Sequence, residues 1–217
     1  MRSPVIPPML AVLVQGALVI PDRMVFDHCE SCPVCGGSVS GYDTIVRQFA
    51  RILDENGIKT ITVTVKRFRC RSCGAIVHAD EPFYPGTRIG SPIVDLCIAF
   101  SQAYGYGRGA RNLRAIGSPL SRMQCRHYAA LPVRPFPIIP LYGFPIPQSI
   151  LALSTLSVSV TKGSGIVGAE ALAACGFPSA GRAALHLPGP GEKRDDGNKE
   201  EGHKKRDAGE PEHGREQ

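Results

Sequence analysis

Four of the eight cysteines in this chain of 217 residues form two Cys-x-x-Cys pairs. Cys32 and Cys35 lie in the segment CPVCGG, and Cys70 and Cys73 lie in CRSCG. A pair with this spacing, followed by glycine, lets two thiolates converge on one ion, and two pairs supply the four soft ligands of tetrahedral Zn²⁺. The spacing therefore predicts a structural zinc site held by Cys32, Cys35, Cys70 and Cys73.

Two residues just before the first pair leave its ligand set open. Cys29 stands three residues before Cys32, and His28 precedes it, so either side chain could replace a ligand. The proline and glycines of CPVCGG favour Cys32 with Cys35. Because four thiolates leave no position open for water, a catalytic zinc is not expected. The cysteines are also too sparse for a secreted disulfide scaffold, which favours the reducing cytoplasm.

Basic side chains are concentrated in one stretch of the chain. Gly36 to Ala130 holds 13 basic and six acidic residues, a net charge of +7, whereas residues 192–217 have a net charge of −2. A basic stretch of this kind favours a polyanionic partner, although it is also compatible with a solvated charged surface. Arginine and glutamine are the side chains that pair with guanine and adenine edges. The candidate DNA contacts are Lys66, Arg67, Arg69, Arg71, Arg108, Arg111, Arg114, Arg122, Gln124 and Arg126.

The elements that position these residues begin with a hairpin. Residues 43–53 fit either a strand or a helix, and the following Asn56-Gly57 indicates a tight hairpin turn. Ile61, Val63 and Val65 alternate with threonines, which predicts a half-buried strand over 58–69 that leads into the second cysteine pair. Two such pairs at the ends of a hairpin make a zinc ribbon.

Helix signals follow the hairpin. Ser91-Pro92 is a start signal, with Ser91 expected to accept a bond from a first-turn amide. Gly105 and Gly107 are expected to end this helix, and residues 108–116 to form a second one. Ser118-Pro119 repeats the start signal for a third helix, with Leu120, Met123 and Leu131 facing inward. Three short helices joined by glycine-containing turns are typical of a helix-turn-helix domain.

The expected fold class is α+β, in five zones. Residues 1–26 are an apolar, proline-interrupted leader, expected to form a buried strand or to precede the true start, with a signal peptide as the alternative. Residues 27–86 are the ribbon and 87–131 the helix-turn-helix-like region. Residues 132–188 are rich in Pro, Ser and Ala and of uncertain structure, and residues 189–217 are a charged, disordered tail. We therefore expect the C-terminal part to be largely irregular.

Three segments together resemble a known family. CPVCGG, VTVKRFRCRSCG and FYPGTRIGSPIVDLCIAFSQAYGYGRGARNLRAIG, within residues 30–118, look like the N-terminal region of prokaryotic insertion-sequence transposases. The resemblance implies a zinc ribbon followed by a helix-turn-helix that binds the terminal repeats of the element. Such transposases also carry an RNase H-like domain whose three carboxylates hold two divalent metal ions.

The chain departs from the family in its carboxylates. Between Asp95 and the tail it has one acidic residue, Glu170, from which a two-metal site cannot be built. A change of reading frame after about residues 118–131 would explain the departure. We therefore expect a truncated, non-enzymatic protein that binds double-stranded DNA, with no membrane and no small-molecule substrate, and we leave self-association open. The alternative is a zinc-ribbon adaptor that contacts proteins in transcription or translation.

Overall fold

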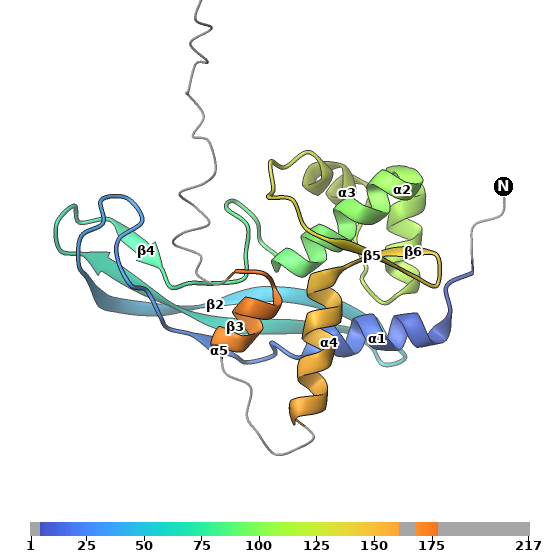
Figure 1. Ribbon diagram of the computed structural model, residues 1–217, viewed down its shortest axis with the longest axis horizontal. Helices are drawn as coiled ribbons and strands as arrows, with labels where there is room; N and C mark the ends of the chain where they lie inside the picture. The colour runs from blue at the N-terminus through green and yellow to red at the C-terminus, as the bar shows by residue number, and fades with distance from the viewer. Residues whose placement is uncertain (1–4, 161–167, 178–217) are drawn as a thin grey trace, which may run out of the picture. The chain divides into compact units, whose positions relative to one another are not determined.

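A long antiparallel hairpin is the scaffold of the structure. In this computed structural model, which describes residues 5–160 and 168–177, β2 (Val39–Asp54) pairs with β3 (Gly57–Cys70) along its length. The opposite edge of β3 pairs with the short strands β1 (Val25–Phe26) and β4 (Ile76–His78). The two cysteine pairs lie at one end of the hairpin, and its turn lies at the other end (Figure 1).

The hairpin forms as the sequence predicts, but its turn is offset by one residue. Asp54 pairs with Gly57, so Glu55 and Asn56 are the two turn residues. The amide of Asn56 donates to Asp54 Oδ1 at 2.8 Å, the local bond that favours aspartate before a turn. Gly57 has a φ of 114°, which glycine tolerates, and it therefore stands where the chain re-enters the sheet.

The alternation of side chains along β3 is confirmed for its first half. Ile61, Val63 and Val65 are buried, and the intervening threonines are exposed or half-buried. The pairing then shifts register between Gly41 and Asp43 of β2, a β-bulge at Tyr42. Beyond it the buried positions of β3 shift by one residue, to Phe68 and Cys70.

A second bulge joins the hairpin to the helices. It lies between Gln48 and Ala50, and it allows the neighbouring residues Phe49 and Ala50 both to be buried. The Phe49 ring occupies the space beside Gly90, where a Cβ would come within 2.4 Å of the ring. The amide of Gly90 also donates to the Phe49 carbonyl at 2.8 Å. Gly90 is therefore required by close contact, just before the first long helix.

The first long helix is α2 (Ser91–Ala115), which a kink at Gly105 divides into two helical segments. Gly105 has φ 74° and ψ 160°, a conformation that glycine adopts readily. A Cβ on Gly109 would lie 3.1 Å from the Phe100 carbonyl oxygen, so the two segments pack closely across the bend. The break expected near Gly105 is confirmed, whereas Gly107 lies inside the second segment. Together with α3 (Arg122–Ala129) this gives three helical segments, but it does not establish a helix-turn-helix geometry.

Two details of the expected helix starts are wrong. The residue that caps α2 is Gly90, and the Ser91 hydroxyl is buried without a hydrogen-bond partner in the described structure. The residue that caps the third helix is Ser121 instead of Ser118, because Ser121 and Gln124 form a reciprocal capping box. On α3, Met123 is 73% exposed and does not face inward as expected.

Residues 8–19 form the helix α1 (Pro8–Val19), which corrects the expectation of a strand. Leu10, Val14, Ala17 and Leu18 are fully buried at helical spacing. The helix packs against α4 (Gln148–Val160), and Gln15 Nε2 donates to the Ile116 carbonyl at 3.5 Å. A 12-residue apolar run fits either element, so its tertiary contacts decide between them.

The expectation of a largely irregular C-terminal part is wrong for most of residues 138–177. This part contains the antiparallel strands β5 (Ile138–Leu141) and β6 (Phe144–Pro147), then α4 and α5 (Gly168–Ala174). Its apolar side chains join those of the hairpin and α2 in one core, which a change of reading frame at 118–131 does not explain. The expected tail at 189–217 lies outside the described residues, and the zone boundaries stay predictions.

A buried polar junction fastens this part to α2. Asp95 of α2 is 1% exposed and accepts hydrogen bonds from Tyr84 Oη at 2.6 Å and Ser149 Oγ at 3.4 Å. Arg134 lies near it and donates to the carbonyls of Cys175 and Gly176. Burial raises the pKa of Asp95 to about 6 against the opposing effect of its hydrogen bonds and Arg134. In the sequence, Asp95 follows the helix start signal Ser91-Pro92, where an acidic side chain suits the positive end of the helix dipole, and nothing local indicates this burial.

The raised pKa of Asp95 predicts a pH-dependent stability. Between about pH 4 and pH 6 the unfolded chain ionises this carboxyl more readily than the folded protein does, so its contribution to stability falls as the pH rises. The shift from 3.8 to about 6 corresponds to about 3 kcal/mol lost by neutral pH. Urea unfolding should show that Asp95→Asn lacks this loss. Glu55→Gln, at an exposed position of the turn, is the control and should keep the wild-type pH dependence. The prediction is wrong if the free energy of unfolding depends on pH equally in wild type and Asp95→Asn, or if Glu55→Gln alters that dependence as Asp95→Asn does.

Packing of β6 against α2 gives a second prediction. Phe144 is 1% exposed and its ring stacks on Phe100, with centroids 6.1 Å apart. Phe144→Ala should lower the free energy of unfolding by about 3–5 kcal/mol, because it removes a buried ring and leaves a cavity. Tyr142→Ala, at an exposed position of the same hairpin, is the control and should change it little. An unaltered stability of Phe144→Ala in denaturant titration would mean that this hairpin is not part of the core.

Candidate metal centre

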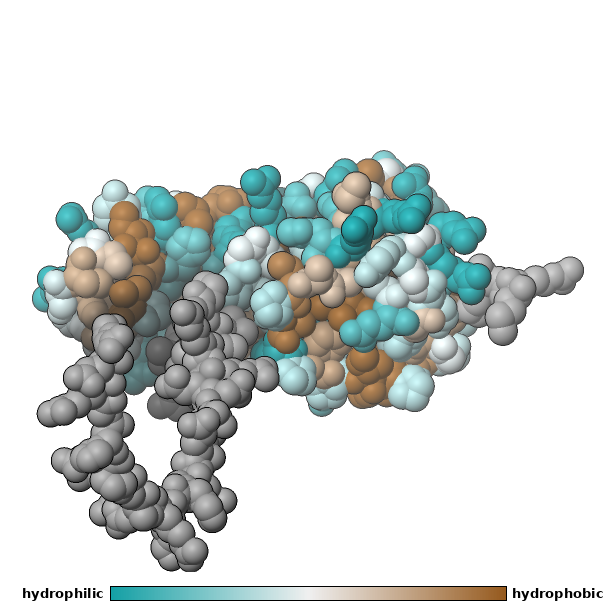
Figure 2. Space-filling model, turned by 90° about the horizontal axis from the view of Figure 1, so that it is seen from above, coloured by the Kyte–Doolittle hydropathy of each residue, from teal (hydrophilic) through white to brown (hydrophobic). Residues whose placement is uncertain are grey.

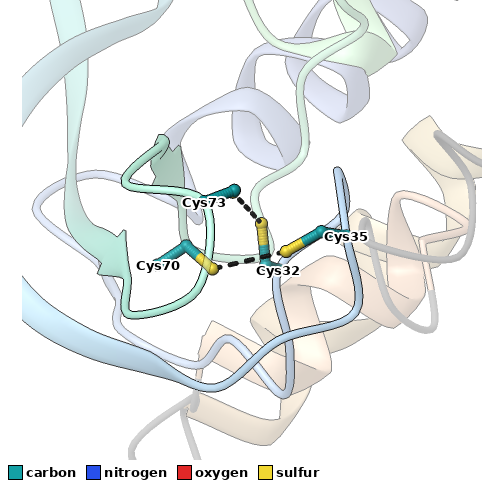
Figure 3. Close-up of side chains that lie close together, drawn as sticks. All are labelled: Cys32, Cys35, Cys70 and Cys73. Carbon is teal, nitrogen blue, oxygen red and sulfur yellow. Dashed lines mark hydrogen bonds between the residues drawn. The ribbon is translucent and has the colours of Figure 1, made fainter.

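The four cysteines of the two pairs meet at one end of the hairpin. The Sγ atoms of Cys32, Cys35, Cys70 and Cys73 all lie within 4.8 Å of one another, and they form the one metal-capable cluster in the described residues. Figure 3 shows the two cysteine loops facing each other with their sulfurs between them. Cys32 and Cys70 are buried, whereas Cys35 and Cys73 are exposed.

The two loops have the same backbone geometry. In each, the first cysteine's amide donates to the carbonyl five residues later: Cys32 to Gly37, and Cys70 to Ala75, both at 2.9 Å. Each first cysteine's carbonyl accepts from the glycine four residues later, and those glycines have φ near +71° and +72°. We call these two loops, residues 32–37 and 70–75, the knuckles. Their repetition shows that one local design positions both thiol pairs.

Contacts between the knuckles set how close they come. Arg71 donates its amide to the Ser38 carbonyl at 2.9 Å, which joins the second knuckle to the end of the first. A Cβ on Gly37 would lie 2.5 Å from Ser72 Oγ, so a larger residue at that position would push the knuckles apart. Gly37 therefore has a role that differs from that of Gly36, whose positive φ forms the turn.

The spacing of the sulfurs fits a tetrahedral ion. With metal–sulfur bonds of about 2.3 Å, a tetrahedral zinc site places neighbouring sulfurs about 3.8 Å apart. The Sγ atoms of Cys32 and Cys73 are 3.8 Å apart, and those of Cys35 and Cys70 are 3.5 Å apart. The four thiols therefore form a site that can hold one metal ion without rearrangement of the knuckles.

The surroundings of the thiols favour thiolate at one position and resist it at another. The backbone amides of Cys73 and Ser72 lower the pKa of Cys70 to about 6 against a smaller opposing effect of burial. The largest influence on Cys35 is the Gly37 amide, which lowers its pKa, but the three neighbouring thiols and burial together raise it to about 12. Four thiolates this close repel one another, and a bound cation removes that repulsion.

The alternative ligands lie outside the cluster. His28 Nδ1 is 3.2 Å from Asp80 Oδ2, and Cys29 Sγ contacts the Ser31 carbonyl at 3.5 Å. Burial and then the charge of Asp80 raise the pKa of Cys29, which disfavours the thiolate. Of the two choices that the sequence leaves open, the structure brings together Cys32 with Cys35.

The candidate DNA contacts beside the second knuckle differ in their exposure and in whether another side chain already pairs with them. Arg69 and Arg71 are exposed. Lys66 is half-buried, with Nζ 5.3 Å from the Phe68 ring centroid. Arg67 donates from both Nε and Nη2 to the Asp43 carboxylate, and this contact lowers the pKa of Asp43. Arg67 is thus already paired within the hairpin.

The other candidates lie on α2 and α3. Arg111, Arg114, Arg122 and Arg126 are exposed, and Arg108 is half-buried. Gln124 is exposed too, but its Oε1 accepts from the Ser121 amide at 2.9 Å to cap α3. Base reading by Gln124 would have to break this cap. The structure therefore places the candidates on two surfaces, one at the knuckles and one on α2 and α3, and their DNA contacts stay predictions.

Sequence reasoning did not single out one exposed side chain on these helices. Tyr106 is 42% exposed and follows the kink of α2. Its position between Gly105 and Gly107 is the one sequence signal for it, because flanking glycines leave an aromatic ring uncovered.

No protein-family model matches the chain, and comparisons with curated proteins and with solved structures found no significant match. In the described parts of the chain, no helix has both the length and the apolar character needed to cross a membrane. The family resemblance in residues 30–118 is therefore a prediction.

The cluster predicts one metal ion per chain. Cobalt(II) added to the reduced protein should give the absorption of a tetrahedral thiolate complex at a 1:1 ratio. Cys70→Ser should lose this spectrum, whereas Cys29→Ser, at a thiol outside the cluster, should retain it. Retention in Cys70→Ser, or loss in Cys29→Ser alone, would show that the ligand set is different.

Proposed function

We propose that the protein is a zinc-stabilised module that binds double-stranded DNA through its basic helical surface and does not cleave it. Zinc is the ion we assign to the four thiols, because soft tetrahedral sites of four cysteines are typical of it. All four positions are filled by protein, so its role is structural. Structural zinc in small modules stabilises folding by on the order of 10 kcal/mol.

The observation on which the proposal of DNA binding mainly rests is a set of arginines without acidic partners. No ion pair within residues 5–160 and 168–177 involves the five arginines of α2 and α3. The chain has no acidic residue at all from 96 to 169. The surface over these helices is mostly hydrophilic (Figure 2). Arginines that nothing neutralises attract phosphate groups and release counterions when they bind them.

The arrangement of these arginines adds to the argument. Arg108, Arg111 and Arg114 recur every three residues along the second segment of α2, opposite the buried Leu113. The Arg122 stem lies at the start of α3, where its Cδ would be 4.0 Å from a Cβ on Gly107. The Arg122 stem therefore lies beside the turn of α2 that contains Gly107, so α2 and α3 can both face one DNA backbone.

The family resemblance supports the same partner. We propose that this chain is a relative of the N-terminal part of insertion-sequence transposases, in which a zinc ribbon and helices bind the DNA of the element. The scarcity of carboxylates after Asp95 supports binding without strand cleavage, because two-metal phosphoryl transfer needs several of them.

An adaptor that binds protein is the second candidate, and one observation favours it. Val34 in the first knuckle is 71% exposed and Ile76 beyond the second is 48% exposed. Apolar residues gather on the surface at the knuckle end of the hairpin (Figure 2). Exposed apolar side chains beside a rigid metal site are suited to contact another protein.

Salt dependence tests the DNA proposal. The logarithm of the association constant for a short duplex should fall with the logarithm of salt concentration, by about 0.9 for each phosphate neutralised. Arg111→Ala should weaken binding to all sequences and reduce that slope by about 1. Arg51→Ala removes the same charge from an exposed site on β2 and is the control. Fluorescence anisotropy that shows no binding at low salt, or binding indifferent to salt and to Arg111, would favour the adaptor.

A further inference from the structure

The outer edge of β2 is open along part of its length. In the described sheet, β3 lies between β2 on one side and the short strands β1 and β4 on the other, so β2 has one neighbouring strand. Near the turn, the helical region covers the outer edge of β2. The Gly90 amide donates to the Phe49 carbonyl and the Leu53 amide donates to the Gly117 carbonyl, both at 2.8 Å. Between this covered part and the bulge at Tyr42, no backbone contact from the described residues reaches the edge.

The hydrogen bonds of β3 show which residues of β2 face this open edge. The Thr64 amide donates at 2.8 Å to the carbonyl of the residue that precedes β1, and therefore points away from β2. Because backbone groups alternate in direction along a strand, those of the neighbouring Val63 and Val65 point toward β2, where they lie opposite Arg47 and Ile45. The residues of β2 that alternate with these two direct their N–H and C=O groups outward. They are Thr44, Val46 and Gln48, and we call residues 44–48 the open segment.

The open segment lacks the features that protect most strand edges from pairing. Such edges commonly carry lysine, proline or a bulge, and here the two bulges flank the segment without interrupting it. Thr44 is exposed, Val46 is 71% exposed and Gln48 is half-buried. The one charged residue of the segment, Arg47, lies on the other face of the sheet, where it pairs with Glu81 and its side chain is 18% exposed. A neutral segment with unpaired backbone groups is a template for another strand.

A second copy of the same segment is the occupant that fits this edge. Antiparallel pairing about a two-fold axis at Val46 places Val46 opposite its own equivalent and Thr44 opposite Gln48 of the second copy. All three outward-facing residues then pair, with about six backbone hydrogen bonds, two for each pair. An axis at Ile45 or Arg47 would leave one of the three without a partner in the segment. No like charges stand opposite each other, and both strands are already extended, so pairing costs little conformational entropy.

We infer that the protein forms a two-fold symmetric dimer in which the open segments of two copies pair and join their sheets into one. The inference goes beyond the binding of DNA and does not depend on it. The paired segment is short, so the association is weak and reversible, with a dissociation constant between about 10 µM and 1 mM. Because each copy has a net charge of +6, moderate salt should strengthen the dimer, which is the opposite of its effect on DNA binding.

Sedimentation velocity of the reduced full chain with added zinc measures this association. The wild type should change reversibly from monomer to dimer over that range of concentration. Val46→Lys and Val46→Glu should each weaken the association about tenfold or more, because each places two like charges at the axis. Ile58→Lys, at an exposed apolar position of β3 outside the open segment, is the control and should associate as the wild type does.

A mixture of the two charged variants tests the position of the axis. Residue 46 faces its own equivalent only if the axis lies there, so equimolar Val46→Lys and Val46→Glu should form a heterodimer, although neither variant dimerises alone. Circular dichroism and the cobalt spectrum of the four thiols establish that each variant is folded.

Three results would overturn the inference. If the wild type stays monomeric up to about 1 mM, the dimer is excluded, and the open segment is left to an extended peptide of another protein. If Val46→Lys associates as tightly as the wild type, the contact between copies lies elsewhere. If the charged variants do not pair when mixed, the axis is not at Val46. None of these results bears on DNA binding, whose own test uses Arg111 and a decrease of affinity with salt.

Discussion

Four thiols within 4.8 Å of one another constrain everything at the knuckle end of the hairpin. Ionised thiols at such distances repel, and protonated ones gain little from being together, so a bound cation would make the arrangement favourable. To present them, β3 must end at Cys70 and β2 must begin beside it, which fixes the register of the hairpin. Cys70, the last residue of β3, is buried at this end of the hairpin.

The hairpin also carries the helices. At its other half, Phe49 packs into the space that Gly90 leaves, and Arg47 holds the loop before α2 through Glu81 and the Thr87 carbonyl. The Arg47 guanidinium lies 3.8 Å from the centroid of the Phe83 ring, which adds a cation–π contact in a half-buried place. The hairpin and α2 are therefore joined by specific packing and hydrogen bonds, and any motion of one relative to the other would break them.

The junction at Asp95 shows why the C-terminal part belongs to the same core. A buried carboxylate is costly unless hydrogen-bond donors surround it, and its donors come from the loop before α2 and from Ser149 at the start of α4. Arg134 spans from this region to the carbonyls of residues 175 and 176. The packing of Phe144 on α2 covers the same helix from another side.

The sequence by itself determined the features that depend on local spacing. Two Cys-x-x-Cys pairs followed by glycine specify two identical turns, and Ile61, Val63 and Val65 specify a strand with one buried face, because these patterns follow from backbone geometry. Tertiary structure alone decided the rest. Residues 8–19 could be a strand or a helix until α4 covered one side of them, and Phe144 had no visible partner until the fold brought α2 beside it. The burial of Asp95 could not be read from its neighbours in sequence, because its hydrogen-bond donors Tyr84 and Ser149 are 11 and 54 residues away.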